Sequence, residues 1–221
     1  MNAIDTVIFD LDGTLVRYHG VNFESSWGAI ARAAGIAERS RELFEQYFPR
    51  KDAYAEWACE EVKLLKGMRV ASIVAEILPA PYASGVREAM DMLRPLYRLG
   101  ILSSGVNLVA DWVCDDLGMA FARSNLVEVK GGRFTGHTVT EVDLWAKHEA
   151  LSALAQAHSI ELHRVCFVGD NLNDLSVMER VGLSIAANPK HERVREAADH
   201  VIEDFMDLPP LIEAFNVAIR S

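Results

Sequence analysis

The chain has 221 residues, of which 50% are hydrophobic and 24% are charged, a composition typical of a globular protein. Its formal net charge of -10 argues against nucleic acid or an anionic membrane as the main partner, because both favour a basic surface. The charge does not exclude a small phosphorylated molecule, since an acidic protein can carry a locally positive site. The three cysteines fit no metal motif, and the sequence shows neither a leader nor an apolar run of about 18 residues, so we expect a cytoplasmic protein.

The first expected element is a buried strand at residues 6–10, and a long helical stretch follows it. Residues 23–78 are rich in Ala, Glu, Leu and Arg, and their apolar residues recur at spacings of three and four. Pro79 and Pro81 then end the helical pattern. This stretch is too long for an ordinary crossover between neighbouring strands, so we interpret it as a helical domain inserted after the first strand.

This interpretation predicts two domains. A core domain is formed by residues 1–16 and 80–221, and a small helical cap domain by residues 17–79. After residue 80 strands and helices alternate, with strands expected at 97–105, 163–170, 183–188 and 200–204, a hairpin at 126–141, and helices at 84–96, 106–118, 143–158, 173–182, 191–198 and from 207. Asp143 is the expected N-cap of the helix at 143–158. The alternation predicts an α/β fold with a Rossmann-like, mainly parallel sheet and helices on both faces.

Small polar or acidic residues follow three of the buried strands. In open parallel sheets, ligands bind outside the carboxyl ends of the strands. The residues at these three ends are Asp10 and Asp12; Ser103, Ser104 and Gly105; and Gly169, Asp170, Asn171 and Asp174. Since the three strand ends share one edge of the sheet, we expect these groups to converge on one site.

Several carboxylates in one crevice repel each other unless a positive group compensates for their charge. A divalent cation does so, and oxygen ligands from carboxylates with retained waters are what Mg²⁺ prefers. The three segments contain no His or Cys, which argues against Zn²⁺. The sequence therefore predicts a Mg²⁺ site.

Four short segments resemble the motifs of the haloacid dehalogenase-like (HAD) phosphatase superfamily. They are "DLDGT" after the first strand, "ILSSG" after the second, a later lysine, and "VGDNLNDL". The helical insertion and the "GGRFTG" hairpin before the lysine helix are similar to the phosphoserine phosphatase branch. The resemblance implies a Mg²⁺-dependent phosphomonoester hydrolase that acts on a small phosphorylated metabolite through an aspartyl-phosphate, with phosphoserine as one candidate substrate.

The resemblance also implies roles for individual residues. Asp10 would be the nucleophile, and Asp12 would be the general acid and then the general base. Ser103 would hold a phosphate oxygen, with the amide of Ser104 beside it at a helix N-terminus that favours anions. Lys147 would neutralise the phosphate and Asp10.

The remaining implied roles concern the metal and the surrounding turns. Asp170 would bind Mg²⁺ together with Asp10 and the backbone carbonyl of Asp12, while Asp174 would orient a metal-bound water or Lys147. The other substrate-binding candidates are Gly13, which permits a tight turn, Thr14, which would support Asp10 by a hydrogen bond, and Gly105, Asn171 and Glu24.

The cap differs from the phosphoserine branch at the residues with which that branch binds its substrate. The pattern has a glutamate shortly after the first motif, near Glu24 here, and an arginine late in the cap. Aligning "EEVKLLKG" with the late segment places Glu61 at the arginine position, and a glutamate cannot donate to a carboxylate at neutral pH. Candidate replacements are Arg50, Lys51 and Arg69. We expect the cap aromatics (Phe23, Trp27, Phe44, Tyr47, Phe48, Tyr54 and Trp57) mostly to pack in a core, with one or two facing the crevice.

Two other function classes stay open. One is a phosphotransferase, which would pass the phosphoryl group from Asp10 to an acceptor other than water. The other is a catalytically inactive binding or regulatory protein that kept the fold. The full set of Asp10, Asp12, Lys147 and Asp170 argues against the inactive protein.

Overall fold

Strand β1 (Thr6–Phe9) lies at the centre of a seven-stranded sheet in the computed structural model, which describes residues 3–21 and 24–220. All four of its residues are buried, and its Val, Ile and Phe side chains favour a strand. β1 pairs in parallel with β2 (Arg98–Val106) and β5 (Val165–Gly169). Because a central parallel strand is covered on both faces, its residues form a continuous apolar run instead of an alternating pattern.

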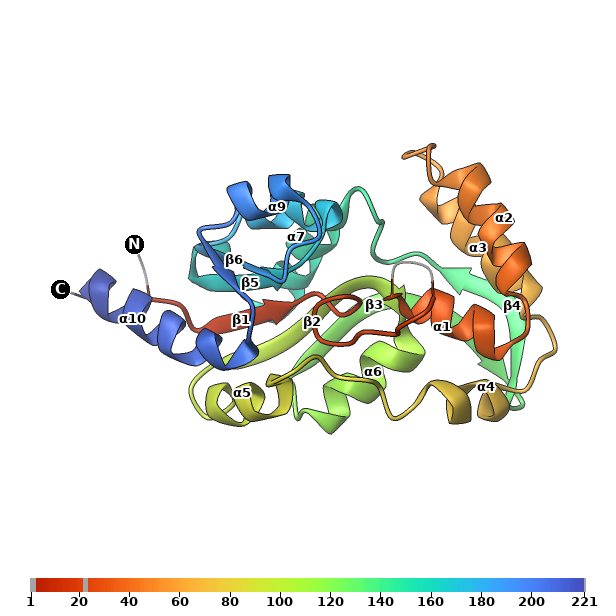
Figure 1. The fold of residues 1–221 in the computed structure, drawn as a ribbon, viewed down its shortest axis with the longest axis horizontal. Helices are drawn as coiled ribbons and strands as arrows, with labels where there is room; N and C mark the ends of the chain where they lie inside the picture. Colours follow the sequence, from red (N-terminus) through yellow and green to blue (C-terminus); the bar gives the residue numbers. More distant parts are fainter. Residues whose placement is uncertain (1–2, 22–23, 221) are drawn as a thin grey trace.

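The strand order is β4-β3-β2-β1-β5-β6-β7 (Figure 1). The outer strands are β3 (Phe121–Lys130), β4 (Arg133–Val139), β6 (Leu183–Ala187) and β7 (His200–Ile202). Every pairing is parallel except that of β3 with β4, which form the expected hairpin. The predicted mainly parallel α/β sheet is confirmed.

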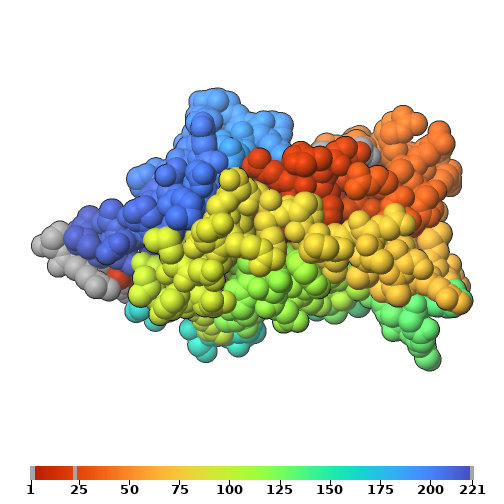
Figure 2. Space-filling model, turned by 60° about the horizontal axis from the view of Figure 1, so that its bottom comes forward, coloured from red at the N-terminus to blue at the C-terminus, as the bar shows by residue number. Residues whose placement is uncertain are grey.

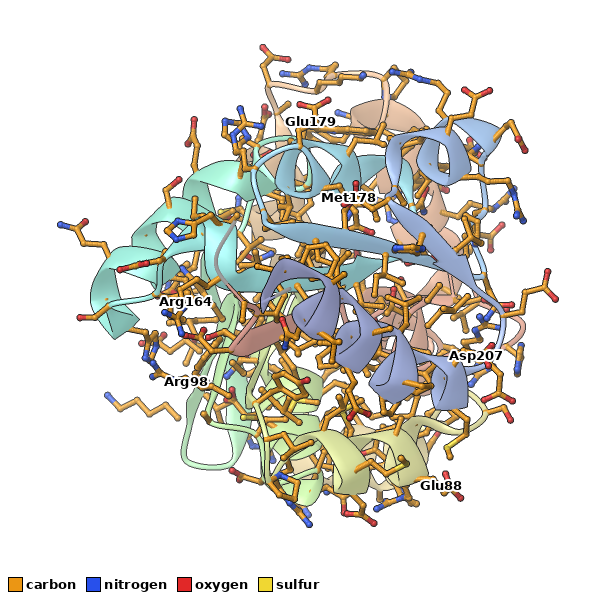
Figure 3. The ribbon with its side chains drawn as sticks, turned by 90° about the vertical axis from the view of Figure 1, so that its left-hand side faces the viewer. Glu88, Arg98, Arg164, Met178, Glu179 and Asp207 are labelled. Carbon is orange, nitrogen blue, oxygen red and sulfur yellow. The ribbon has the colours of Figure 1, made fainter. Side chains whose placement is uncertain are left out.

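Helices cover both faces of this sheet. On one face lie α5 (Val86–Leu93), α6 (Asn107–Asp116) and α10 (Leu208–Arg220). On the other face lie α7 (Lys147–His158), α8 (Leu175–Met178) and α9 (Glu192–Ala197). The view along the sheet places exposed charged side chains such as Glu88, Arg98 and Asp207 at the periphery (Figure 3).

The alternation of side chains along β1 divides the core into two clusters. Val7 and Phe9 pack with α5, α6 and α10, whereas Ile8 packs with α7, α8 and α9. All three side chains are fully buried. Burying apolar surface on both faces is the main stabilising contribution, at roughly 25 cal/mol per Å² of apolar surface.

Four helices are inserted between β1 and β2. They are α1 (Ser26–Ala33), α2 (Ala37–Tyr47), α3 (Tyr54–Leu64) and α4 (Val70–Ile77), called the inserted helices below. They lie beside the far end of the β3–β4 hairpin (Figure 1). The hairpin joins them through three backbone hydrogen bonds, from Gly67 N to Phe134 O (2.8 Å), Phe134 N to Met68 O (3.1 Å) and Val70 N to Gly132 O (3.0 Å). The boundaries at 17–79 for the cap stay a prediction.

One face of the molecule is a continuous surface formed largely by α4, α5 and α6 (Figure 2). The yellow and green segments in this view run from the C-terminal helix to the inserted helices without a break. Of the inserted helices, α4 therefore extends the layer that covers this face of the sheet.

Two sequence-based helix boundaries were wrong. α7 begins at Lys147, and Asp143 is not its N-cap, because its carboxylate accepts hydrogen bonds from the amides of Trp145 (2.7 Å) and Ala146 (3.0 Å) and stabilises a turn before the helix. The predicted helix at 173–182 contains only the short α8, preceded by a 3-10 turn at Leu172–Asp174. Within the ranges that the structure describes, no helix combines the length and the apolar character needed to cross a membrane.

The side chain of Asn125 on β3 ties the inserted helices to the end of β2. It is fully buried. Its Nδ2 donates to Tyr54 Oη (3.0 Å), Ser104 O (2.8 Å) and Val142 O (3.1 Å). Its Oδ1 accepts from the amides of Glu141 (3.0 Å) and Val142 (2.9 Å). One amide group thus fixes three chain segments around the end of β2.

Asn125→Ala should lower the free energy of unfolding by about 3 kcal/mol, because it leaves several buried donors and acceptors without partners. Urea denaturation measures this loss. The matched control is Thr135→Ala, which removes a surface hydrogen bond to Glu128 on the same hairpin and should cost about 0.5 kcal/mol. A loss below about 1 kcal/mol for Asn125→Ala would contradict this role.

Candidate active site

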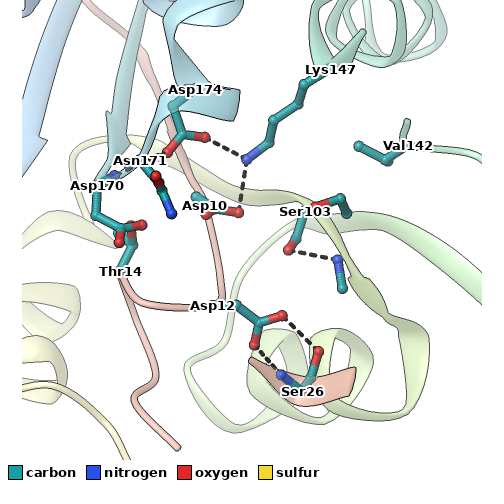
Figure 4. A network of polar contacts seen from close by, with 12 residues as sticks. Asp10, Asp12, Thr14, Ser26, Ser103, Val142, Lys147, Asp170, Asn171 and Asp174 are labelled. Atoms are coloured by element: carbon teal, nitrogen blue, oxygen red, sulfur yellow. Dashed lines mark hydrogen bonds and ion pairs between the residues drawn. The ribbon is translucent and has the colours of Figure 1, made fainter. Parts of the chain in front are cut away.

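The ammonium group of Lys147 lies between two buried carboxylates (Figure 4). Its Nζ is 2.8 Å from Asp10 Oδ1 and 2.7 Å from Asp174 Oδ1. Lys147 and Asp174 are fully buried, and Asp10 is nearly so. A buried charge is tolerated when it is paired and hydrogen-bonded, and here one cation balances two anions from different strand ends.

Strand register and a capping turn hold these carboxylates in place. The amide of Asp10 donates to Val168 O on β5 (2.9 Å), which aligns the end of β1 with the end of β5. Asp174 Oδ2 accepts from the amides of Asp170 (3.0 Å) and Asn171 (3.1 Å), so its carboxylate caps the turn that follows β5. The carboxylates that follow β1 and β5 therefore lie close together, as the shared edge of parallel strands predicts.

Thr14 contacts a different carboxylate from the one expected. Its hydroxyl donates to Asp170 Oδ1 (2.9 Å) and not to Asp10, because the turn after β1 carries Thr14 toward the end of β5. Gly13 in this turn has φ of 86°, and a Cβ there would lie 2.5 Å from Asp170 Oδ2 and 2.5 Å from Lys190 Nζ. Both the conformation and the close approach require glycine.

Asp12 faces the N-terminus of α1. Its Oδ1 accepts from the amide of Ser26 and its Oδ2 from the hydroxyl of Ser26, both at 2.7 Å (Figure 4). Burial raises the pKa of Asp12 to about 7, although these hydrogen bonds act in the opposite direction. A carboxyl with this pKa can give up or take a proton near neutral pH, which general acid–base catalysis requires.

Burial shifts the pKa of the other ionisable groups as well. It raises the pKa of Asp10, with Lys147 opposing the shift, and it raises that of Asp170 to about 7. For Lys147, burial lowers the pKa, but the two neighbouring carboxylates outweigh it and the net shift is upward. Lys147 is therefore a permanent cation at physiological pH.

Three carboxylates form a group that could hold a divalent cation. Ligand oxygens of Asp10, Asp170 and Asp174 lie within 4.8 Å of one another, and all three residues are buried. Asp10 Oδ1 and Asp170 Oδ2 are buried and accept no well-aligned hydrogen bond. Carboxylate oxygens suit Mg²⁺, so the residues present fit a hard divalent cation. The carboxylate of Asp12 lies outside this group, because both its oxygens bind Ser26.

Ser103 and Ser104 lie near the end of β2. Ser103 is buried, and its Oγ accepts from the amide of Gly105 at 3.1 Å (Figure 4). Ser104 does not lie at a helix N-terminus as expected, because β2 continues to Val106 and α6 begins at Asn107. The carbonyl of Ser104 instead accepts hydrogen bonds from side chains of the inserted helices.

A cavity of about 420 Å³ opens above these strand ends. Six of the predicted site residues line it, namely Asp10, Asp12, Ser103, Ser104, Gly105 and Asn171. Five further predicted site residues lie outside the lining: Gly13, Thr14, Lys147, Asp170 and Asp174. Glu24 does not line the cavity either. Its carboxylate lies 3.1 Å from His19 Nδ1 and 3.9 Å from Lys190 Nζ, and its predicted contact with substrate stays a prediction.

A family model for haloacid dehalogenase-like hydrolases matches residues 4–182 of the chain. The chain belongs to this family. It is also 33% identical over 195 residues to the phosphoserine phosphatase of Saccharomyces cerevisiae, with 86% of this chain and 61% of that protein covered. It is 29% identical to the phosphoserine phosphatases of Archaeoglobus fulgidus and Methanocaldococcus jannaschii, with 55% and 91% of those proteins covered. The chain thus spans less than two thirds of the yeast and Archaeoglobus relatives.

The fold of this HAD-like hydrolase is likewise similar to solved structures. A structure of a phospho-aspartyl intermediate analogue of phosphoserine phosphatase aligns with a TM-score of 0.75 and 28% identity, over 94% of this chain and 98% of that one. A substrate-bound phosphoserine phosphatase complex aligns with a TM-score of 0.75 and 27% identity, over 94% of this chain and 98% of that one. These similarities confirm the predicted family.

Lys190 is a site residue of this HAD-like hydrolase that the sequence reasoning missed. It follows β6, and its Nζ lies 3.1 Å from Asp170 Oδ2, while its amide donates to Asp170 O at 3.0 Å. It also lines the cavity. The end of β6 lies at the same edge of the sheet as the ends of β1 and β5, so extending the strand-end argument to a fourth strand would have found it.

The expectation for the cap aromatics was also wrong. Five of them line the cavity instead of packing mainly in a core: Trp27, Phe44, Phe48, Tyr54 and Trp57. Trp145, which precedes α7, joins them. Phe23 lies outside the described residues. Helical spacing identifies the apolar side of a helix, but it does not distinguish a packed core from a cavity wall.

Lys147→Met should lower the free energy of unfolding by about 3 to 5 kcal/mol, because it leaves the buried carboxylates of Asp10 and Asp174 without their cation. An acid whose folded-state pKa is raised keeps its proton to a higher pH in the folded state than in the unfolded state. The loss should therefore grow as the pH rises above the unfolded-state value of 3.8 for Asp10.

The measurement is urea denaturation of metal-free protein at two pH values, with Lys130→Met as the control. Lys130 is an exposed lysine at the end of β3, and its loss should cost about 0.5 kcal/mol or less. Equal effects for the two variants would show that Lys147 does not balance the buried charge.

Proposed function

We propose that this HAD-like hydrolase is a Mg²⁺-dependent phosphatase that hydrolyses small phosphomonoesters through a phosphorylated Asp10. One observation carries the proposal: Asp10 and Asp12 both line one cavity, while the buried Lys147 lies 2.8 Å behind Asp10. The similarity to proteins named phosphoserine phosphatase supports phosphomonoester chemistry. The substrate would bind through contacts with its phosphate at one end of the cavity and with its leaving group at the other end.

In the first step, a carboxylate oxygen of Asp10 attacks phosphorus. A bond forms between that oxygen and phosphorus as the bond from phosphorus to the ester oxygen breaks. Asp12 gives its proton to the departing oxygen, so that an alcohol leaves instead of an alkoxide. The pKa of about 7 for Asp12 makes its protonated form available for this transfer.

In the second step, water attacks the phosphorus of the aspartyl-phosphate. Asp12, now a carboxylate, takes the proton of the attacking water, and the bond from phosphorus to Asp10 breaks. Inorganic phosphate leaves, and the Asp10 carboxylate and the Asp12 proton are restored. Lys147 keeps the charge of Asp10 balanced throughout, and Ser103 would donate to a phosphate oxygen.

Asp10 and Asp170, together with the carbonyl of Asp12, would hold Mg²⁺, and Asp174 would position Lys147. The ion supplies positive charge that stabilises the charge developing on the phosphoryl oxygens. The Asp174 carboxylate already accepts a hydrogen bond from Lys147 at 2.7 Å, which supports its positioning role.

Asp10→Asn should lower kcat/KM for p-nitrophenyl phosphate by at least roughly a thousandfold, since an amide is a poor nucleophile toward phosphorus. Phosphate release by the purified, Mg²⁺-loaded chain measures the rate, and thermal unfolding shows that the fold persists. Asp91→Asn, an exposed carboxylate on α5 with a side chain 71% exposed, is the matched control and should retain the full rate.

An unchanged rate in Asp10→Asn would rule out Asp10 as the nucleophile. Adding an alcohol acceptor to the same assay separates hydrolysis from phosphoryl transfer, because a transferase would form the phosphorylated alcohol in place of inorganic phosphate. If the metal-loaded chain hydrolysed none of a broad panel of phosphate esters, the proposal that it is an enzyme would be excluded.

EDTA should abolish turnover, and added Mg²⁺ should restore it. Mg²⁺ should also raise the melting temperature of the native chain, because it neutralises buried carboxylates in the folded state alone. Asp170→Asn should remove most of this shift, while Asp91→Asn should keep it. A rate that EDTA leaves untouched, together with a melting temperature that Mg²⁺ leaves unchanged, would contradict the Mg²⁺ assignment.

A further inference from the structure

The half of the cavity formed by the inserted helices contains one charged side chain among the described lining residues. It is Glu61 on α3, which is 7% exposed. The lining residues Lys190 and His191 both follow β6, on the side of Asp170. The one ionisable side chain among the described lining residues at the leaving-group end is therefore an acid, with no basic lining residue beside it.

The carboxylate of Glu61 is held by one of its two oxygens. Oε1 accepts from Ser40 Oγ (2.9 Å) and from Trp57 Nε1 (3.2 Å). Oε2 accepts no hydrogen bond within the described part of the chain. Burial raises the pKa of Glu61, which means that its charged form needs a positive partner to be stable there.

Aromatic rings form a continuous wall that begins beside this carboxylate, at Trp57. Ring centroids are 6.0 Å apart for Tyr54 and Trp57, 5.8 Å for Trp57 and Phe44, and 4.7 Å for Phe44 and Phe48. Phe48 continues the wall to Trp145 at 5.4 Å. All five rings line the cavity, so the wall runs from α3 through α2 to the loop before α7.

The polar atoms of Trp27, Tyr54 and Trp57 are already bound to protein groups. Trp27 Nε1 and Tyr54 Oη donate to the carbonyl of Ser104, at 3.1 Å and 2.6 Å, and Trp57 Nε1 donates to Glu61. A ligand at this end therefore meets ring faces and edges instead of ring donors. Ring faces attract cations, and most strongly when the cation is desolvated.

Among the described residues, none of the three candidate cations of the cap lines this half of the cavity. Arg50 is exposed, pairs with Glu56 at 3.1 Å and does not line the cavity. Lys51 is exposed and lies 4.7 Å from the centre of the Trp145 ring, and it is not a lining residue either. The third candidate replacement, Arg69, is exposed as well. A substrate carboxylate at this end would face Glu61 without compensation.

From this juxtaposition we infer that the leaving alcohol of the substrate carries an organic ammonium group. The aromatic wall encloses this group, and the carboxylate of Glu61 forms an ion pair with it. The inference rests on the proposed phosphatase function and names its substrate class, a phosphate ester of a cationic amino alcohol. It also separates this chain from phosphoserine as substrate. The carboxylate of phosphoserine would be repelled at the position where the cation is held.

The test compares esters that share a shape and differ in charge. The cationic probes are phosphocholine and its longer-chain homologues, and each has a neutral isostere in which a tert-butyl group replaces the trimethylammonium group. For the best-fitting chain length, kcat/KM of the cationic ester should exceed that of its isostere by about tenfold or more. Phosphoserine should be a poorer substrate than the cationic ester.

Glu61→Gln removes the charge and keeps the size of the side chain. It should bring the ratio of cationic to neutral kcat/KM to within about threefold of one, mostly through KM. Glu60→Gln is the matched control, since Glu60 neighbours Glu61 on α3 but pairs with Lys63 at the surface at 2.6 Å. The control should keep the ratio of the native chain.

A second measurement needs neither turnover nor a variant. Choline should quench the fluorescence of the tryptophans that line the cavity, whereas the neutral alcohol of the same shape should do so about tenfold more weakly. Hydrolysis of p-nitrophenyl phosphate with no preference for cationic esters would overturn this inference and leave the proposed function standing. Absence of all turnover, with choline still binding, would overturn the proposed function alone. A neutral alcohol that binds as well as choline would exclude the ammonium site.

Discussion

The ion pairs of Lys147 are the interaction on which the arrangement of the site depends. Asp10 and Asp174 come from different strand ends and are buried side by side, which would be costly without the cation between them. The position of Lys147 as the first residue of α7 follows from this demand. A lysine is unfavourable near a helix N-terminus, and two carboxylates outweigh that local cost.

Much of the catalytic end was predictable because parallel strands share one edge. That rule alone brought Asp10, Asp12, Ser103 and Asp170 together from distant parts of the sequence. It failed where a turn decides the partner of a side chain, as for Thr14, whose hydroxyl binds Asp170. Lys190 was missed because its strand end carries no acidic residue.

The cap end was less predictable, for a physical reason. An amphipathic helix has the same pattern whether its apolar side meets another helix or encloses a cavity, so Phe44 and Phe48 could not be assigned from spacing. The sequence did contain one specific signal, a glutamate at the arginine position of the phosphoserine branch. The structure gives that signal a meaning by burying Glu61 among aromatic rings.

Two of the attachments of the inserted helices differ in kind. On one side, backbone hydrogen bonds join Gly67 and Val70 to the β3–β4 hairpin. On the other side, side chains such as those of Trp27 and Tyr54 converge on a single carbonyl, that of Ser104. The side-chain bonds bring α1 and α3 to one point, so the end of β2 sets where these two helices lie. Because that carbonyl belongs to the strand end that carries Ser103, a shift there would move the wall of the cavity and the Ser103 hydroxyl together.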